Sequence, residues 1–520
     1  MASYLSPGVY VEEKPSGVQV IAGVGTSTAA FIGLIEQDEI KYPDVNKDYD
    51  ADLAVKAMKP PEQHEEEVNK LNQEISDLQN EINVAEDALN KIKQDLGKPD
   101  ISDAQKKKLT TRQNDQQSNV SNKKSELENK KNQLEKIKNP SPVSEDDKKK
   151  LKPYIEKDFH IDVEKCVPKL CTNFGEYSKR FGSFSIDDSK YSGHRALSHA
   201  VYGFFANGGT RCYVARVKSE SELSNALKNF EAIDAIAIVA APGLTGKATW
   251  EALIAHCELC KDRFAILDGT ETVGSDDEVD VSLLSYETKN NLVPPRNKNA
   301  AYYFPFIQCI DPAKQLQDQD PARGVPLKHR GEIYVPPSGH IAGVYAKTDE
   351  ERGVHKSPAN AAIRGAVGLK YYIGRPRHDL LNPQGVNAIR NMNGNISIWG
   401  ARTIGGDKNG EWKYLSVRRL FLFLRESIDE GTQWVVFEPN DRALWGKIRR
   451  NVGAFLTTVW RSGALFGSSP EEAFYVKCDD ETNPPEVREM GQVVTEIGVA
   501  IVRPAEFVIF RIQQDSGKAS

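Results

Sequence analysis

The sequence lacks the features that identify secreted, membrane-spanning and nucleic-acid-binding proteins. Its N-terminus has no charged segment followed by an apolar one, and no uninterrupted apolar run approaches the length of a membrane span. Lys and Arg number 68 against 74 Asp and Glu, so the net charge is −6 and no basic excess favours nucleic acid or anionic lipid. We therefore expect a soluble multidomain protein, made and folded in the cytoplasm, with no nucleic-acid partner and no direct membrane insertion.

Cysteine is scarce and irregularly placed. The chain has 7 cysteines, an odd number, which favours reduced thiols over a disulfide framework. Cys257 and Cys260 form one CxxC pair inside a helical pattern, but no second CxxC accompanies them. Buried thiols are the favoured interpretation over a redox or zinc site, so we expect no metal and no cofactor.

Catalytic motifs are missing as well. The chain contains neither HExxH nor GxSxG. The loop PGLTGKA at residues 242–248 is similar to a phosphate loop, but that motif needs Gly at position 241 and a hydroxyl at 248, and both residues are Ala. The acidic loop at 276–280 lacks the alternating ligands and the Gly of an EF-hand. The sequence thus predicts a protein that is not an enzyme.

A helical segment of unusual composition lies between residues 56 and 152. Apolar residues recur at spacings of three and four from Val68 to Leu96, and Gly97 and Pro99 then interrupt the helix. A second, more polar pattern follows. The two patterns predict an antiparallel coiled-coil hairpin with arms of about 35 residues, or roughly 50 Å. Because both of its ends lie together, such an insertion should project from a host domain.

The rest of the chain alternates strands and helices. A strand at 235–241, a helix at 249–261 and a strand at 264–268 predict a βαβ unit, and residues 27–35 begin with another β-rich run. Residues 442–462 form an amphipathic helix that Asn440 or Asp441 can cap. These patterns predict an α/β domain.

Several expected strands have no mate nearby in the sequence. We expect strands at 18–21, 434–437, 493–502 and 506–512. Two strands alone do not form a stable sheet, so those near the C-terminus must find partners. Whether these strands pair within the chain or with another chain therefore decides the function that the sequence indicates.

Short motifs run in order through the chain outside the helical segment. They are SPGVYVEE at 6–13, FANGG at 205–209, CYVAR at 212–216, FAILD at 264–268, PPSGHIAG at 336–343, SPAN at 357–360, WGART at 399–403, VFEPND at 436–441 and RPAEF at 503–507. In number and order they resemble the tail sheath proteins of contractile phage tails and contractile injection systems. Two departures are His355, where the family usually has Trp, and the coiled-coil insertion, where family members have a short loop.

The resemblance implies a multidomain fold of α/β and α+β parts with an intermolecular β-sheet. Its expected divisions are an N-terminal interlocking arm at 1–25, an outer α/β domain at 26–55 and 153–349, the inserted hairpin at 56–152, and a C-terminal sheath domain with its arm at 350–520. The expected strand-exchange residues are Val18, Val20, Ile21, Val499, Ile501, Phe507, Ile509 and Ile512. The expected contacts to an inner tube are Arg442, Lys447, Arg449 and Arg450.

The implied function is that of a structural subunit that polymerises helically around an inner tube and contracts to drive the tube through a target envelope. Its implied partners are further copies of the chain in stacked hexameric rings, the inner tube protein, and baseplate and terminal cap proteins. Assembly is expected in the cytoplasm, within a phage tail or an injection particle. The alternatives are a nucleotide-binding enzyme and a coiled-coil adaptor that does not polymerise.

Overall fold

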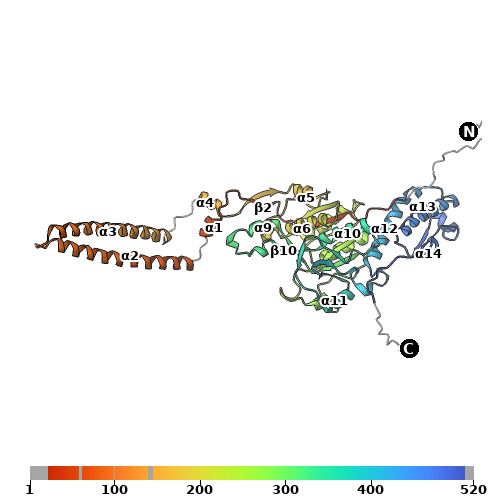
Figure 1. Ribbon diagram of the computed structural model, residues 1–520. Helices are drawn as coiled ribbons and strands as arrows, with labels where there is room; N and C mark the ends of the chain where they lie inside the picture. The colour runs from red at the N-terminus through yellow and green to blue at the C-terminus, as the bar shows by residue number, and fades with distance from the viewer. Residues whose placement is uncertain (1–20, 58–60, 99, 139–144, 510–520) are drawn as a thin grey trace, which may run out of the picture. The chain divides into compact units, whose positions relative to one another are not determined.

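The protein is described by a computed structural model that covers residues 21–57, 61–98, 100–138 and 145–509 (Figure 1). The contacts divide the chain into two units. The larger unit contains residues 1–43, 156–317 and 327–520, and the smaller one contains residues 44–155 and 318–326.

A mixed sheet organises the larger unit. Within the described residues it has nine strands in the order β11-β14-β13-β8-β7-β6-β1-β5-β4. The pairings from β13 through to β5 are parallel, whereas β13 with β14, β14 with β11 and β5 with β4 are antiparallel. In chain order the strands are β1 (Ala29–Leu34), β4 (Lys169–Cys171), β5 (Cys212–Val217), β6 (Ile238–Ala240), β7 (Phe264–Asp268), β8 (Ala300–Phe304), β11 (Ala361–Ala362), β13 (Val386–Met392) and β14 (Asn395–Ile398).

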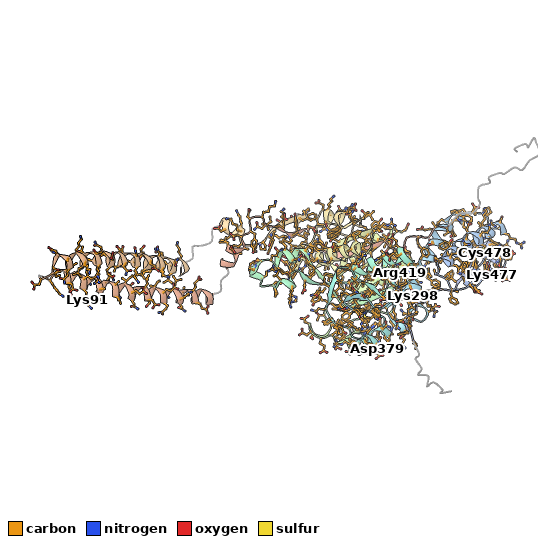
Figure 2. All side chains as sticks on the ribbon, viewed as in Figure 1. Lys91, Lys298, Asp379, Arg419, Lys477 and Cys478 are labelled. Carbon is orange, nitrogen blue, oxygen red and sulfur yellow. The ribbon has the colours of Figure 1, made fainter. Side chains whose placement is uncertain are left out.

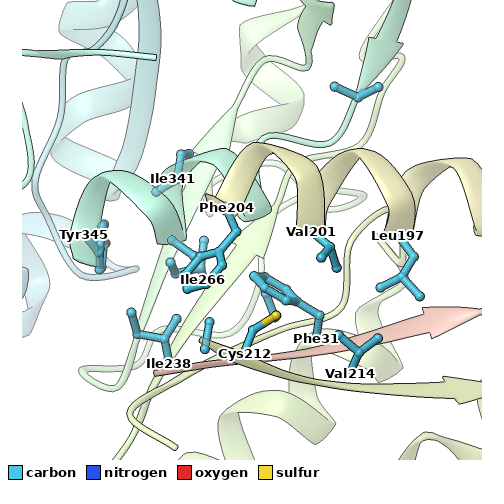
Figure 3. Close-up of a cluster of buried hydrophobic side chains, with 14 of the residues drawn as sticks. Phe31, Leu197, Val201, Phe204, Cys212, Val214, Ile238, Ile266, Ile341 and Tyr345 are labelled. Atoms are coloured by element: carbon cyan, nitrogen blue, oxygen red, sulfur yellow. The ribbon is translucent and has the colours of Figure 1, made fainter. Parts of the chain in front are cut away.

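Helices cover both faces of this sheet, which explains why its central strands are apolar throughout. Helices α6 (Ser192–Ala206) and α10 (Ser338–Arg352) pack on one face, where Phe31 meets Phe204 at a centroid distance of 5.5 Å (Figure 3). Helices α7 (Leu223–Glu231) and α8 (Lys247–Cys260) pack on the other face. The predicted βαβ unit is confirmed, because β6 and β7 pair in parallel on either side of α8 in the sequence.

Smaller elements complete this part of the chain. They are β2 (Glu39–Val45) paired with β3 (Tyr154–His160), a three-stranded sheet of β10 (Glu332–Val335), β9 (Ile307–Ile310) and β12 (Ala366–Leu369), and the helices α5 (Phe174–Phe181), α9 (Pro312–Gln317) and α11 (Arg375–Leu381). The nine-stranded sheet continues past residue 350, because β13 and β14 belong to it.

The C-terminal region has its own hydrophobic cluster. Helices α12 (Leu415–Thr432) and α13 (Arg442–Arg461) supply most of it, and the short helices α14 (Pro470–Ala473) and α15 (Pro485–Glu489) flank it. The predicted cap of α13 is confirmed, since the Asp441 side chain accepts a hydrogen bond from Leu444 N at 2.8 Å.

Two strand predictions in this region need correction. Residues 434–437 do not form a strand, because α12 continues into the 3-10 turn η8 (Gln433–Val435), and Phe437 then takes a positive φ of 67°. The strand expected at 493–502 shortens to β16 (Glu496–Val499), which pairs with the unpredicted strand β15 (Phe474–Lys477). Of the strand expected at 506–512, the described part up to residue 509 is not in a strand.

The smaller unit contains two helices of equal length, α2 (Pro61–Leu96) and α3 (Asp103–Lys138), which lie side by side (Figure 1). Lys130 Nζ lies 2.7 Å from Glu74 Oε2, and Lys123 pairs with Glu81, so the two helices run antiparallel. Near α1 (Ala51–Ala57) and α4 (Glu145–Lys150), Asn46 Nδ2 donates to the carbonyl oxygens of Lys149 and Lys152 at 2.7 and 2.8 Å. The two chain segments that lead to the helices therefore lie together.

Candidate subunit-interlocking site

Strand β16 has an uncovered edge. Gly498 pairs with Tyr475, and Ala500 N donates a hydrogen bond of 2.8 Å to Ala473 O. The backbone groups of Gly498 and Ala500 therefore face β15. Backbone groups alternate between the two sides of a strand, so those of Ile497 and Val499 face the opposite edge. Within the described residues no strand pairs with that edge. It is therefore open to an added strand.

The side chains along this edge hold β16 against its own domain. Ile497, Val499 and Ile501 are half-buried against the C-terminal hydrophobic cluster. Ile501 also bridges to Leu465, next to a hydrogen bond from Phe466 N to Ala500 O of 2.7 Å. The structure thus places the predicted residues Val499 and Ile501 at the uncovered edge. Figure 2 marks Lys477 at the end of β15 and Cys478 just after it.

The chain beyond β16 exposes a run of large apolar side chains. Phe507, Val508 and Ile509 have exposed fractions of 69%, 69% and 79%. Three consecutive large apolar side chains with this exposure are unusual on a protein surface. Ile512, the last predicted exchange residue, lies outside the described residues.

A buried ion pair anchors this tail immediately before the apolar run. Arg402 donates from Nε and Nη2 to the two Glu506 carboxylate oxygens at 2.8 and 2.9 Å. Asn382 Nδ2 and Tyr414 OH donate to the same carboxylate at 2.8 and 3.0 Å. Burial alone would raise the pKa of Glu506, but these hydrogen bonds and the Arg402 charge outweigh it and hold the pKa below its ordinary value.

The N-terminal segment is anchored in a similar way. Thr26 Oγ1 donates to Asp349 Oδ2 at 2.6 Å, and Arg419, marked in Figure 2, binds both oxygens of Asp349 at 2.9 and 2.6 Å. Val24 N donates to Ser427 Oγ at 3.1 Å. The predicted residue Ile21 is buried in the C-terminal cluster and is not in a strand, whereas Val18 and Val20 lie outside the described residues.

The four cations predicted to meet a tube all lie on α13 and are exposed. Arg442 Nη2 forms a 3.0 Å ion pair with Asp480, and Arg449 donates to the carbonyl oxygen of Cys478. Lys447 and Arg450 share the exposed side of the helix. The structure brings the four together as one basic helix face.

The loop and the cysteines that the sequence offered as nucleotide or metal candidates lie in the α/β domain, apart from Cys478. Residues 242–246 form a turn in which Gly243 N approaches Asp268 Oδ2 at 3.4 Å, and Lys247 and Ala248 begin α8. Six of the seven cysteines, including Cys257, are buried as predicted, whereas Cys260 is only half-buried. Burial raises the pKa of Cys260 to about 11. No cluster of metal-ligating side chains occurs in the part of the chain that the structure describes.

Two features of the site were not predicted from the sequence. Strand β15 has only four residues, and the segment Phe474–Lys477 does not alternate apolar with polar residues, so its sequence gave no clear strand signal. The pairing of Arg402 with Glu506 joins residues 104 positions apart, and neither residue's neighbours signal the other.

A mixed α/β fold with an unpaired strand edge and an exposed apolar segment is typical of a subunit of a larger protein assembly. Two family models match the chain, the phage tail sheath protein central domain over residues 217–404 and the phage tail sheath C-terminal domain over residues 407–515. The chain belongs to the contractile tail sheath family.

Individual relatives agree with this family. The tail sheath protein of Vibrio phage KVP40 is 28% identical over 181 residues, which are 34% of this chain and 26% of the relative. A prophage major tail sheath protein of Pseudomonas aeruginosa is 27% identical over 184 residues, which are 34% of this chain and 45% of the relative. The chain thus matches less than half the length of these two curated relatives.

Solved structures match a longer part of the chain. The sheath complex of the extracellular contractile injection system PVC, in its contracted state, has a TM-score of 0.56 and 28% identity, over 68% of this chain and 88% of that one. The helical sheath of the anti-feeding prophage AFP, also contracted, has a TM-score of 0.54 and 27% identity, over 67% and 88%. None of the helices in the described ranges has the length and apolar character needed to cross a membrane.

Proposed function

We propose that the chain is the structural subunit of a contractile sheath, which polymerises helically around an inner tube and contracts to drive the tube through a target envelope. The observation that carries this proposal is the unpaired edge of β16, together with the exposed apolar residues 507–509, in a chain of the sheath family. A strand that leaves one copy and pairs with the edge of another is β-augmentation. A contact of this kind that does not close on itself produces a helical filament.

The two anchors explain how such a joint can flex without separating. In the proposed joint the residues from 507 onward, including Phe507, Ile509 and Ile512, leave the Glu506 anchor and pair with a neighbour. Residues before Ile21, including Val18 and Val20, do the same from an anchor formed by Thr26 and the buried Ile21. Val499 and Ile501 lie in the receiving strand. Because each anchor lies within one copy, rigid bodies can rotate during contraction while the intermolecular sheet stays intact.

We place the division between the outer and C-terminal domains near residue 405, and not at 350. The nine-stranded sheet includes β14 up to Ile398, whereas the C-terminal cluster draws mainly on residues from Leu420 onward. The family models divide at 404 and 407. The insertion at 56–152 is proposed to be a coiled-coil hairpin that projects from the outer domain.

The remaining partners follow from the same proposal. The face of α13 with Arg442, Lys447, Arg449 and Arg450 would meet acidic residues of the inner tube protein. Copies would form stacked hexameric rings, with a baseplate and a terminal cap at the ends. Assembly would occur in the cytoplasm, before release within a phage tail or an injection particle.

Electron microscopy of the purified chain tests the proposal. Wild-type protein should form striated tubes or rings, and a variant lacking residues 1–25 should remain a folded monomer. A variant in which a short linker replaces residues 60–152 is the control, because it removes more of the chain yet should still assemble. Normal tubes from the first variant, or no assembly of the wild type under any condition, would contradict the proposal.

A further inference from the structure

The end of the helical pair at which α2 passes into α3 is strongly basic. Residues 91–112 contain seven cations against three acidic residues, so their net charge is +4, and we call this stretch the basic tip. Its cations are Lys91, Lys93, Lys98, Lys106, Lys107, Lys108 and Arg112. Figure 2 marks Lys91 near the end of α2. The net charge of −6 for the whole chain conceals this local excess.

The stretches next to the basic tip have no positive charge. Residues 71–90 of α2 and 113–122 of α3 contain neither Lys nor Arg. Farther along α3, Lys123, Lys124 and Lys130 each form an ion pair with a glutamate of α2. A shaft without cations therefore separates the basic tip from the lysines at the other end of the pair.

The cations of the basic tip are available to a partner. All seven are exposed, and Lys98 alone has an ion pair, in which its Nζ lies 2.5 Å from Asp95 Oδ1. Among the described residues the other six have no acidic partner within 4.0 Å. Lys106, Lys107 and Lys108 also lie in the first turns of α3, where the positive end of the helix dipole disfavours cations. Charges that oppose local helix stability in this way are expected at functional surfaces.

A hollow of about 360 Å³ lies among these cations. Lys108 and Arg112 line it beside the paired Asp95 and Lys98, and Ile101 adds an apolar side chain. Ile101 lies in the connection between the two helices and is half-buried. Cations beside an apolar side chain match the boundary between the phosphates and the acyl chains of a bilayer.

The directions of the lysines favour a soft surface that the basic tip meets end-on. Successive residues of a helix point about 100° apart, so Lys106, Lys107 and Lys108 face three directions. One flat protein surface would meet only part of this set, whereas mobile lipid headgroups can surround it. Residues 61–138 also contain no Phe, Tyr or Trp, the side chains on which single-stranded nucleic acid stacks.

We propose that the basic tip binds the surface of a bilayer that contains anionic phospholipids. The lipid phosphates would lie on Lys106, Lys107, Lys108 and Arg112, and Ile101 would reach the headgroup boundary. The contact is peripheral, and no helix crosses the bilayer. The basic tip belongs to a single copy, so the inference does not depend on assembly, although many copies in one particle would bind more tightly together.

Flotation of the full chain with lipid vesicles tests this contact. Wild type should float with phosphatidylcholine vesicles that contain about one third phosphatidylglycerol, and not with pure phosphatidylcholine. Lys106→Gln, Lys107→Gln and Lys108→Gln together should weaken binding roughly a hundredfold, because each lysine at an anionic surface contributes about fivefold. Added salt should weaken the binding of wild type, since it screens these charges.

The matched control removes three exposed cations from the other part of α3. Lys124→Gln, Lys131→Gln and Lys136→Gln change the net charge equally. They lie farther from the basic tip than the Debye length of about 10 Å, so vesicle binding should change by less than about twofold. Gln has nearly the helix propensity of Lys, and circular dichroism of both variants checks that α3 remains helical. An equal loss of binding in the two variants would overturn the proposal.

A DNA duplex distinguishes a lipid site from a site for any polyanion. Ile101→Ser should weaken vesicle binding about threefold by removing an apolar contact, and should leave the binding of a duplex unchanged. Tighter binding to the duplex than to the anionic vesicles at the same salt, or no flotation of wild type, would overturn the proposal. These outcomes concern single copies and leave the sheath function standing, whereas a failure to form tubes would leave this inference standing.

Discussion

Breaking the pair between Arg402 and Glu506 should cost a measurable part of the stability of the C-terminal region. The side chains are 3% and 19% exposed, and two hydrogen bonds of 2.8 and 2.9 Å join them. Removing one partner of a buried pair typically costs about 3–5 kcal/mol, because the other charge is left without compensation. Asp407 Oδ1 lies 3.2 Å from Arg402 Nη1 and still compensates in part, so we expect about 2–3 kcal/mol for Glu506→Gln.

A double-mutant cycle isolates the pair from its surroundings. Glu506→Gln, Arg402→Met and the double variant are unfolded in urea as monomers, and hydrogen exchange of residues 500–509 reports on the tail itself. The coupling energy should be about 2 kcal/mol. Glu496→Gln on β16, which is exposed, is the matched control and should change stability by less than about 0.5 kcal/mol.

The pH dependence of the same variants gives a second readout. The pKa of Glu506 is lowered in the folded protein, so its contribution is present above the unfolded-state pKa and is lost as the pH falls below it. The difference in free energy of unfolding between wild type and Glu506→Gln should therefore become smaller as the pH is lowered. A coupling energy under about 0.5 kcal/mol, or a gap that widens in acid, would refute the anchor.

Three further changes probe the fold. Burial raises the pKa of Asp268 to about 7, so the carboxyl group stabilises the fold fully below the unfolded-state pKa of 3.8, and this stabilisation is lost as the pH rises through 7. The free energy of unfolding of wild type, measured in urea at several pH values, should therefore fall relative to that of Asp268→Asn over this range. A pH-independent difference between the two proteins would contradict this prediction. Asp441→Ala should cost about 1 kcal/mol by removing the α13 cap, while Asp441→Asn should retain most of it. Lys130, whose side chain is 27% exposed, faces α2, and Lys130→Leu places an apolar side chain there. In thermal melting this variant should stabilise the pair of helices by about 1 kcal/mol. A lower melting temperature would show that the ion pair with Glu74 contributes more than the added apolar contact.

The elements predicted well are those with a strong local signal. Strand β7 is a continuous apolar run between a helix and a turn, and α13 has both a cap and an apolar stripe, so local pattern sufficed. Residues 434–437 were misassigned because a short apolar run fits a buried strand and a helix end equally well. Phe437, the last residue of this run, has a positive φ of 67°, which is not the conformation of a β-strand.

The candidate site was predictable only in part. An excess of strands without mates pointed to the C-terminal region, and the structure places Val499 in one of them. The anchors could not be found in this way, because Arg402 with Glu506 and Asp349 with Arg419 are joined by the folded chain and not by local sequence. The pairing of such residues depends on topology, which periodicity does not encode.

The bidentate contact of Arg402 with Glu506 also has a consequence for the way in which the tail would resist a mechanical pull. A pull on residues 507–509 reaches the fold first at Glu506, where two N–H groups of one planar guanidinium hold two oxygens of one planar carboxylate. Two hydrogen bonds loaded in parallel share an applied force, whereas bonds loaded one after another break one at a time. Asn382 and Tyr414 hold the same carboxylate from other directions, so the grip resists pulling from more than one angle. A pull on residues 507–509 would therefore be taken up at Glu506 and would not reach residue 505 until these contacts break.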